Sequence, residues 1–140
     1  MDKITTHSPQ ETKELAEDII SSLSSNIVAL VGPLGSGKTV FAQGVGELFH
    51  IDSMLSPTYT LIRQYSIDHS RFKTLYHIDL YRLNSTQEIL DLGIQEIWQD
   101  DSNLVLIEWA DKIEDQLPKN HLRLEFKVKD QDTRQIVTKK

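Results

Sequence analysis

The sequence contains no cysteine, few aromatic residues and no surplus of positive charge. The absence of cysteine excludes disulfide bonds and thiolate metal sites. There are 15 Lys and Arg residues against 21 Asp and Glu residues, which gives a formal net charge of −6. A protein that binds the nucleic-acid backbone usually has a basic surplus and clustered Lys and Arg. We therefore expect any connection to RNA to run through a partner protein.

The chain also lacks a long hydrophobic run of the kind that directs secretion or membrane insertion. We therefore expect a cytoplasmic protein without membrane contact. Its 140 residues suffice for one compact α/β domain and leave no room for a second catalytic domain of ordinary size. A single domain over residues 1–140 is expected to perform the whole function.

A complete phosphate-binding loop, G-x-x-x-x-G-K-[ST], is present at residues 32–39. Its glycines let backbone N–H groups close around phosphate oxygens, and the N-terminus of the following helix favours negative charge. Lys38 is predicted to reach the β- and γ-phosphates, and the Thr39 hydroxyl to ligate Mg²⁺. The residues expected to contact the nucleotide are Leu34, Gly35, Ser36, Gly37, Lys38 and Thr39.

The flanking segments favour this interpretation over a chance match in a glycine-rich turn. Residues 26–31 form an apolar, partly β-branched run that is typical of a strand buried on both faces of a parallel sheet. After the loop, Phe41, Val45 and Leu48 recur at helical spacing. Strand, loop and helix therefore occur in the order that phosphate binding requires.

The remaining elements alternate along the chain. Ser8 and Glu11 form a capping-box pair around Pro9, which predicts the start of a helix. Other expected elements are a strand-like opening at 3–7, strands at 59–67, 74–81 and 104–107, short helices at 87–92 and 95–98, and an antiparallel pair at 122–128 and 135–138. The predicted fold is a P-loop NTPase-like α/β domain with a mixed, partly parallel sheet flanked by helices.

Two acidic residues, Asp79 and Glu108, compete for a place beside the loop, because ligands gather at the carboxyl ends of parallel strands. Glu108 follows four apolar residues, so a buried carboxylate there would need Mg²⁺ or hydrogen-bond partners. The alternatives are an ordinary strand-end acid for Glu108 and a surface salt-bridge residue for Asp79. His77 is interpreted as structural and receives no catalytic role.

Several sequence blocks occur in a characteristic order. They are the phosphate loop, Ser-Pro-Thr-Tyr-Thr-Leu at 56–61, His-Ile-Asp-Leu-Tyr-Arg-Leu at 77–83, Leu-Gly-Ile at 92–94 followed by Glu96, and Ile-Glu-Trp at 107–109 with Ile-Glu-Asp at 113–115. With these blocks the chain resembles, over nearly its whole length, the bacterial TsaE family of ATPases in tRNA threonylcarbamoyladenosine biosynthesis.

The resemblance implies a Mg²⁺-dependent ATPase that supports the TsaD–TsaB complex, which modifies the adenosine beside the tRNA anticodon. ATP and Mg²⁺ are the implied cofactors, TsaD and TsaB the implied partners, and tRNA is reached through them. The implied catalytic residues are Lys38 on the phosphates, Thr39 and Glu108 at Mg²⁺, Asp79 as the Walker-B-like acid, and Thr58 in a switch loop near the γ-phosphate. Trp109 is expected to shape the site, with a core aromatic as the alternative.

The phosphate loop departs from the family's usual pattern at Pro33, Ser36 and Val40, where the family usually has Asp, Ala and Thr. Pro33 removes a backbone N–H, which bears on nucleotide affinity and loop mobility. The resemblance also implies base contacts from the segment at 8–12, without assigning individual residues. The absence of an N-K-x-D sequence favours adenine over guanine.

Two other functions use the same loop. A small-molecule kinase needs a lid and arginines over the transferring phosphate, but residues 83–99 are short and acidic, and no arginine lies between Arg82 and Arg123. The second alternative is a nucleotide-gated binding module that never hydrolyses ATP, and the sequence does not decide against it. Arg63, Arg71 and Arg82 are candidate arginine fingers by charge alone, so we expect slow hydrolysis that partners accelerate.

Overall fold

A mixed sheet forms the centre of the computed structural model, which describes residues 2–51 and 61–139. The strand order is β1-β7-β6-β2-β5-β4-β3. β2 pairs in parallel with β5 and β6, and β4 pairs in parallel with β5, whereas the remaining pairs are antiparallel. The strands are β1 (Asp2–Thr6), β2 (Ile27–Val31), β3 (Ile62–Ser66), β4 (Thr74–Asp79), β5 (Asn103–Glu108), β6 (Leu122–Val128) and β7 (Arg134–Lys139).

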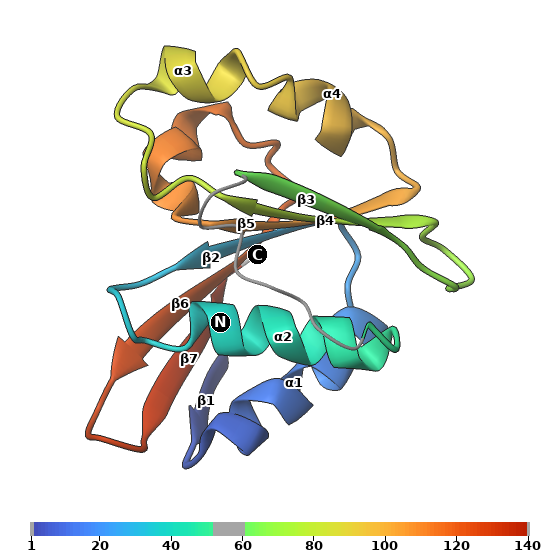
Figure 1. Cartoon of the computed structure of the whole chain (residues 1–140). Helices are drawn as coiled ribbons and strands as arrows, with labels where there is room; N and C mark the ends of the chain where they lie inside the picture. The colour runs from blue at the N-terminus through green and yellow to red at the C-terminus, as the bar shows by residue number, and fades with distance from the viewer. Residues whose placement is uncertain (1, 52–60, 140) are drawn as a thin grey trace.

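Helices cover both faces of this sheet (Figure 1). One face carries α1 (Pro9–Ser21) and α2 (Lys38–Leu48), and the other carries α3 (Thr86–Leu90), α4 (Ile94–Gln99) and the 3₁₀ helix η1 (Ala110–Gln116). The predicted fold class, a mixed and partly parallel sheet flanked by helices, is therefore confirmed. Among the described residues, none of the helices has the length and apolar character that crossing a membrane requires.

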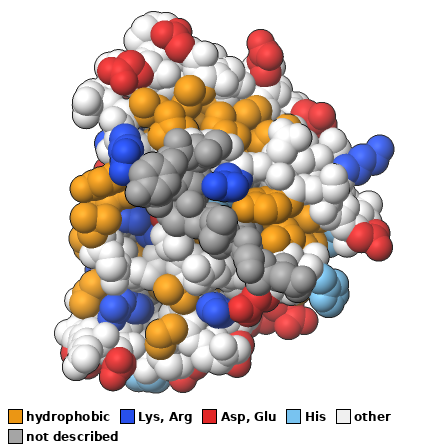
Figure 2. Space-filling model, viewed as in Figure 1, with side chains coloured by type: hydrophobic (Ala, Val, Ile, Leu, Met, Phe, Trp, Pro, Cys, Tyr) orange, Lys and Arg blue, Asp and Glu red, His pale blue; other side chains and the backbone are white. Residues whose placement is uncertain are grey.

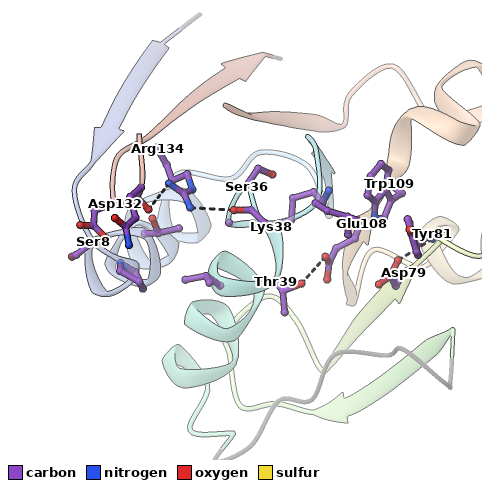
Figure 3. Close-up of a pocket in the computed structure, with 17 residues that line it drawn as sticks. Ser8, Ser36, Lys38, Thr39, Asp79, Tyr81, Glu108, Trp109, Asp132 and Arg134 are labelled. Carbon is purple, nitrogen blue, oxygen red and sulfur yellow. Dashed lines mark hydrogen bonds between the residues drawn. The ribbon is translucent and has the colours of Figure 1, made fainter. Parts of the chain in front are cut away.

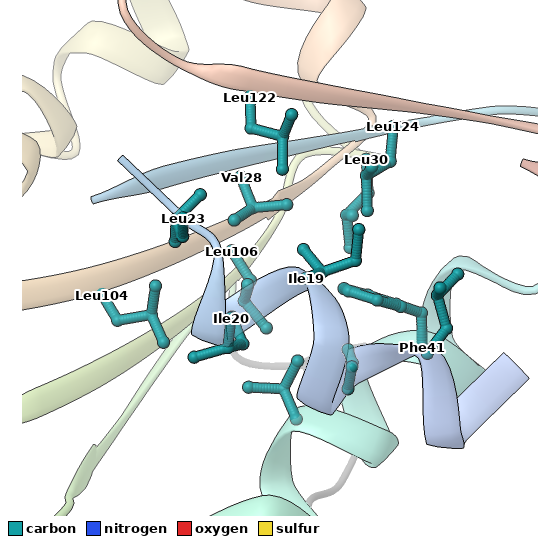
Figure 4. Packing of buried hydrophobic residues seen from close by; sticks show 14 of the residues in the cluster. Ile19, Ile20, Leu23, Val28, Leu30, Phe41, Leu104, Leu106, Leu122 and Leu124 are labelled. Atoms are coloured by element: carbon teal, nitrogen blue, oxygen red, sulfur yellow. The ribbon is translucent and has the colours of Figure 1, made fainter. Parts of the chain in front are cut away.

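Alternating side chains of the central strands divide the core into two layers. Val28 and Leu30 pack under α1 and α2, close to Ile19 and Phe41 (Figure 4), whereas Ile27 packs on the opposite face. All residues of β5 are buried, which explains its continuous apolar run, since a central parallel strand has no solvent-facing side. The same alternation places the last residue of β5, Glu108, on the α2 side of the sheet, in line with Leu104 and Leu106.

The start of α1 agrees with the prediction. The Ser8 hydroxyl accepts a hydrogen bond from the Glu11 backbone N–H at 3.1 Å, and Pro9 occupies the first turn. The Glu11 carboxylate accepts in turn from the His7 backbone N–H at 3.1 Å, one residue before the cap. The first of these contacts satisfies an N–H group that a helix start leaves unpaired.

Three details differ from the predicted elements. β4 ends at Asp79 rather than at residue 81, because the Asp79 carboxylate turns the chain by accepting the Tyr81 backbone N–H at 2.9 Å. Helix η1 was not predicted from the sequence, and it follows Trp109 in a left-handed conformation. Of the strand expected at 59–67, β3 covers Ile62–Ser66, and residues 59 and 60 lie outside the described part of the chain.

Charge is distributed over the surface without a concentrated basic area on the face that Figure 2 shows. Lys and Arg side chains lie scattered across this face, and Asp and Glu side chains lie mainly around its margin. This pattern agrees with the net charge of −6. It is unlike the continuous basic stripe that tracks a nucleic-acid backbone.

Candidate nucleotide-binding site

A pocket of about 350 Å³ lies at the carboxyl ends of the parallel strands. The phosphate loop, the ends of β4 and β5, the start of α1 and the β6–β7 hairpin all contribute to its walls (Figure 3). Ser8, Pro9 and Thr12 line it, in the segment for which base contacts were expected. Open α/β sheets bind ligands at this edge because the loops there diverge and leave a crevice.

Close packing shapes the phosphate loop. A Cβ added at Gly32 would lie 2.7 Å from the Phe126 carbonyl oxygen, so no larger residue fits between β2 and β6. Gly37 has φ 110°, a left-handed conformation that favours glycine, and α2 begins directly after it at Lys38. The unpaired N–H groups at the start of α2 therefore face the loop, in the arrangement that favours an anion.

The Lys38 ammonium is buried at the centre of this loop. Its Nζ donates hydrogen bonds to the carbonyl oxygen of Gly32 and, at 3.3 Å, to that of Pro33. The same Nζ lies 3.7 Å from the centroid of the Trp109 ring, within cation–π range. Burial lowers the pKa of Lys38, while the nearby carboxylates of Glu108, Asp111 and Asp79 oppose that shift.

Glu108 connects β5 to the first turn of α2. The Thr39 Oγ1 donates to Glu108 Oε1 at 2.9 Å, and Glu108 Oε2 lies 2.5 Å from His77 Nε2. The Glu108 side chain is only 2% exposed. Its place follows from strand register, because Glu108 is paired with Leu30 in β2, two residues before the loop. The parallel pairing of β2 with β5 thus sets Glu108 beside the loop.

Asp79 ends the neighbouring strand and is in register with Glu108. Its side chain is half-buried and lines the pocket, while its Oδ1 accepts the Tyr81 backbone N–H. Burial raises the pKa of Asp79 and Glu108 adds to the shift, while the Tyr81 N–H, His77 and Lys38 act against it. The structure brings both candidate acids to one edge, and the Thr39 hydroxyl contacts Glu108.

Trp109 joins the loop to the rest of the site. Its backbone has φ 60°, which is unusual for a bulky residue, and its N–H donates to the Leu30 carbonyl at 3.1 Å. The ring lies against Lys38 and has its centroid 5.2 Å from that of the Tyr81 ring. Trp109 packs against the core and also lines the pocket. A role in shaping the site, which the sequence suggested, stays a prediction.

None of the candidate arginines, Arg63, Arg71 and Arg82, is among the described residues that line the pocket. Arg71 donates to the carbonyl oxygens of Leu23 and Ser24 at 2.6 and 3.1 Å, after the end of α1. Among the described residues that line the pocket, Arg134 is the only arginine. Its Nη2 donates to the Gly35 carbonyl at 3.1 Å from 99 positions away in the sequence. Thr58, the predicted switch-loop residue, lies outside the described residues.

Sequence reasoning missed the β6–β7 hairpin as a wall of the pocket. Gln131, Asp132 and Arg134 line it, yet these residues form no motif and their segment resembles an ordinary polar turn. The signal that could have found them is the strand order, because β6 pairs directly with β2 and so brings its following hairpin to the loop.

Comparisons with known proteins agree with this geometry. The family model for "Threonylcarbamoyl adenosine biosynthesis protein TsaE" matches residues 6–136. A tRNA threonylcarbamoyladenosine biosynthesis protein TsaE from Rickettsia bellii is 40% identical over 131 residues, which cover 91% of this chain and 88% of that protein. The TsaE protein of Bacillus subtilis is 36% identical over 136 residues, which cover 96% of this chain and 82% of that protein.

A solved structure shows the same architecture. The crystal structure of YdiB from Bacillus subtilis superposes with a TM-score of 0.75 at 32% sequence identity, covering 96% of this chain and 82% of that one. Sequence and structure therefore agree over most of the length of both proteins. The chain belongs to the TsaE family of threonylcarbamoyl adenosine biosynthesis proteins.

Proposed function

We propose that the chain is a Mg²⁺-dependent ATPase whose turnover supports a TsaD–TsaB complex during threonylcarbamoyladenosine modification of tRNA. The observation that carries the proposal is the contact between Thr39 and Glu108 beside the buried Lys38 ammonium. The ammonium of Lys38, the hydroxyl of Thr39 and the carboxylate of Glu108 thus meet at the N-terminus of one helix. This combination is typical of a site for a nucleoside triphosphate with its metal ion.

The loop residues fit the phosphates. Lys38 Nζ donates hydrogen bonds to two carbonyl oxygens of its own loop. An incoming phosphate can compete with these oxygens for the N–H groups of Lys38. The start of α2 adds backbone N–H groups and a partial positive charge. The Lys38 Nζ also lies 3.7 Å from the centroid of the Trp109 ring.

Thr39 and Glu108 fit Mg²⁺ because they offer a hydroxyl and a carboxylate oxygen, the hard ligands that this ion prefers. Within the described part of the chain, no cluster of three or more His, Asp or Glu residues could hold a metal ion. Such incomplete protein ligation suits Mg²⁺, which usually keeps waters and substrate phosphates as ligands. When bound, Mg²⁺ would neutralise charge on the transferring phosphoryl group.

Asp79 is suited to orient the attacking water. Its carboxylate is half-buried at the pocket wall, one strand away from the Thr39–Glu108 contact. The Tyr81 N–H holds one of its oxygens, and the second oxygen of a carboxylate can accept a hydrogen bond from a water molecule. In phosphoryl transfer to water, positioning of this kind is the main task left to protein side chains.

The contacts of Arg134, the arginine among the described residues of the pocket, support a dependence on partners. Arg134 already donates to carbonyl oxygens of Gly35, Asp130, Gln131 and Thr133, so its guanidinium is engaged in holding the loop and the hairpin. A free arginine finger contributes roughly 10³ to 10⁵ in rate. We propose that hydrolysis is slow in the isolated chain and that the TsaD–TsaB complex, which the family resemblance implies, supplies the missing group or loop order.

The test is ATP turnover by the purified chain with Mg²⁺ and with EDTA, using Lys38→Ala and the matched control Lys13→Ala. Lys13 pairs with Glu47 on the surface, outside the pocket. Slow phosphate release that requires Mg²⁺, is lost in Lys38→Ala and persists in Lys13→Ala supports the proposal. ATP that stays bound and intact over many hours would indicate a nucleotide-gated binding module, and a phosphorylated small molecule in place of free phosphate would indicate a kinase.

A further inference from the structure

We infer that His77 is a positioning residue that holds the Glu108 carboxylate in the orientation required by Thr39 and by a bound Mg²⁺. The metal part of this inference rests on the proposed function. The contact between His77 and Glu108 stands on the structure alone. From the sequence alone, His77 was interpreted as structural, because a lone histidine in a strand is more often structural than catalytic.

His77 and Glu108 form a buried pair. Their side chains are 1% and 2% exposed, and His77 Nε2 lies 2.5 Å from Glu108 Oε2. His77 is in register with Leu106, two residues before Glu108, and it is two residues before Asp79 on β4. By strand alternation all these side chains point to the α2 side of the sheet, so the imidazole lies on the same face as both acids of the site.

The pair divides the two oxygens of Glu108 between two partners. Oε1 accepts the Thr39 hydroxyl, and Oε2 takes the hydrogen bond of His77. A carboxylate held at both oxygens cannot rotate about its terminal bond without losing one contact. Without this partner, Oε2 would be a buried charged acceptor whose desolvation penalty is not compensated by a hydrogen bond. His77 thus has the role of an outer partner that orients a metal ligand.

The second ring nitrogen indicates which tautomer is present. His77 Nδ1 is buried and has no hydrogen-bond partner among the described residues. A proton on Nδ1 would create a buried unpaired donor and would leave Nε2 facing a carboxylate without a hydrogen. Of the two neutral forms, the arrangement therefore fits the Nε2–H tautomer, with Nε2 donating to Glu108.

The test compares two replacements with a matched control. His77→Gln keeps an N–H donor near the position of Nε2, whereas His77→Leu fills similar space without one. His121→Leu is the control, since His121 contacts the Pro118 carbonyl and does not line the pocket. A fluorescent N-methylanthraniloyl ATP analogue reports binding, and each variant is titrated with Mg²⁺ and also measured in EDTA.

We expect His77→Leu to raise the half-saturating Mg²⁺ concentration by at least about tenfold, as losses of such outer partners typically do. Binding in EDTA stays within about twofold of wild type, and His77→Gln recovers most of the Mg²⁺ dependence. An unchanged Mg²⁺ requirement in His77→Leu, or equal damage in both variants, would overturn the inference. A wild-type chain that binds no nucleotide would overturn the proposed function instead.

Nuclear magnetic resonance provides a readout that needs no nucleotide. Long-range ¹H–¹⁵N correlation spectra, assigned by difference with His77→Gln, are expected to show His77 as the Nε2–H tautomer. A His77 ring protonated at Nδ1 alone cannot donate from Nε2 to Glu108 and would overturn the inference, whatever the nucleotide experiments show.

Discussion

Thr39 Oγ1 lies 2.9 Å from Glu108 Oε1, although the two residues are 69 positions apart in the sequence. The parallel pairing of β2 with β5 produces this contact, because it sets the end of β5 beside the loop that follows β2. The first turn of α2 and the last residue of β5 therefore act as one unit. Substitutions of the two acids at this edge, Glu108 and Asp79, should separate metal binding from hydrolysis.

Replacing Glu108 by Gln should weaken Mg²⁺-dependent ATP binding, because a neutral amide is a poorer ligand for this ion. Replacing Asp79 by Asn should leave binding close to wild type and lower the hydrolysis rate, by about 10² if Asp79 orients the attacking water. Equilibrium binding and single-turnover rates measured on both variants distinguish the roles. The reverse pattern would exchange the roles of the two acids.

Trp109 offers an optical report of nucleotide binding. The chain has two tryptophans, Trp98 and Trp109, so Trp98→Phe leaves Trp109 as the sole indole. We expect ATP to change its emission, because phosphate draws the Lys38 ammonium from its place 3.7 Å from the ring centroid. The same titration of Trp98→Phe combined with Lys38→Ala should give a flat signal. A response that persists without Lys38 would refute this explanation.

Gly44 is predicted to be required for the packing of α1 against α2. A Cβ added there would lie 2.5 Å from the Lys13 carbonyl oxygen and 2.6 Å from Lys13 Cα, both backbone atoms that cannot move aside separately. Gly44→Ala should lower the free energy of unfolding by about 1–3 kcal/mol through overpacking, despite a gain in helix propensity.

The control for this prediction is Glu47→Ala, one turn along the same helix, which removes the surface pair with Lys13 at 3.0 Å. We expect a loss below about 1 kcal/mol there, since exposed ion pairs contribute little. Urea unfolding measures both variants. A larger loss in Glu47→Ala than in Gly44→Ala would mean that the helix contact is not limited by backbone approach.

Glu125 should make the free energy of unfolding depend on pH in the acidic range. The hydrogen bond from Lys139, with the charges of Arg123 and Lys139, holds the pKa of Glu125 below its ordinary range. The folded state therefore binds this proton less readily than the unfolded state. The contribution of Glu125 is present above the unfolded pKa of about 4.3 and is lost as the pH falls through the lower folded value.

Comparing Glu125→Gln with the wild-type chain tests this dependence. The free energies of unfolding should differ by less than about 1 kcal/mol, because the group is near the surface. That difference should be largest above about pH 5 and should shrink as the pH falls below about 4. A difference that stays constant across this range would show that the ion pairs do not stabilise the folded state.

Local patterns predicted the parts of the site that are contiguous in sequence. The phosphate loop with its flanking strand and helix has a fixed spacing, and the position of Glu108 after four apolar residues marks a strand end. The contact between Thr39 and Glu108 depends on the pairing of β2 with β5. That pairing is set by the packing of the whole sheet and not by a local pattern. Tertiary contacts of this kind leave no local period in the sequence.

Arg134 and His77 show where sequence reasoning ends. Arg134 reaches the loop from a hairpin 99 positions from Gly35, and nothing in its neighbourhood sets it apart from other charged turn residues. A role for His77 can be inferred only once its contact with Glu108 is known, because a buried histidine alone does not indicate a function. Helix η1 was missed for a related reason, because it follows the unusual backbone of Trp109 rather than a recognisable helix start.

The most direct test of the central claim is the rate of ATP hydrolysis as the cognate TsaD–TsaB dimer is titrated into a fixed amount of this chain with Mg²⁺. We predict a slow basal rate that rises with the dimer to a plateau, and no turnover with Lys38→Ala at any dimer concentration. Rates that are equal with and without the dimer, or absent in both, would contradict the account.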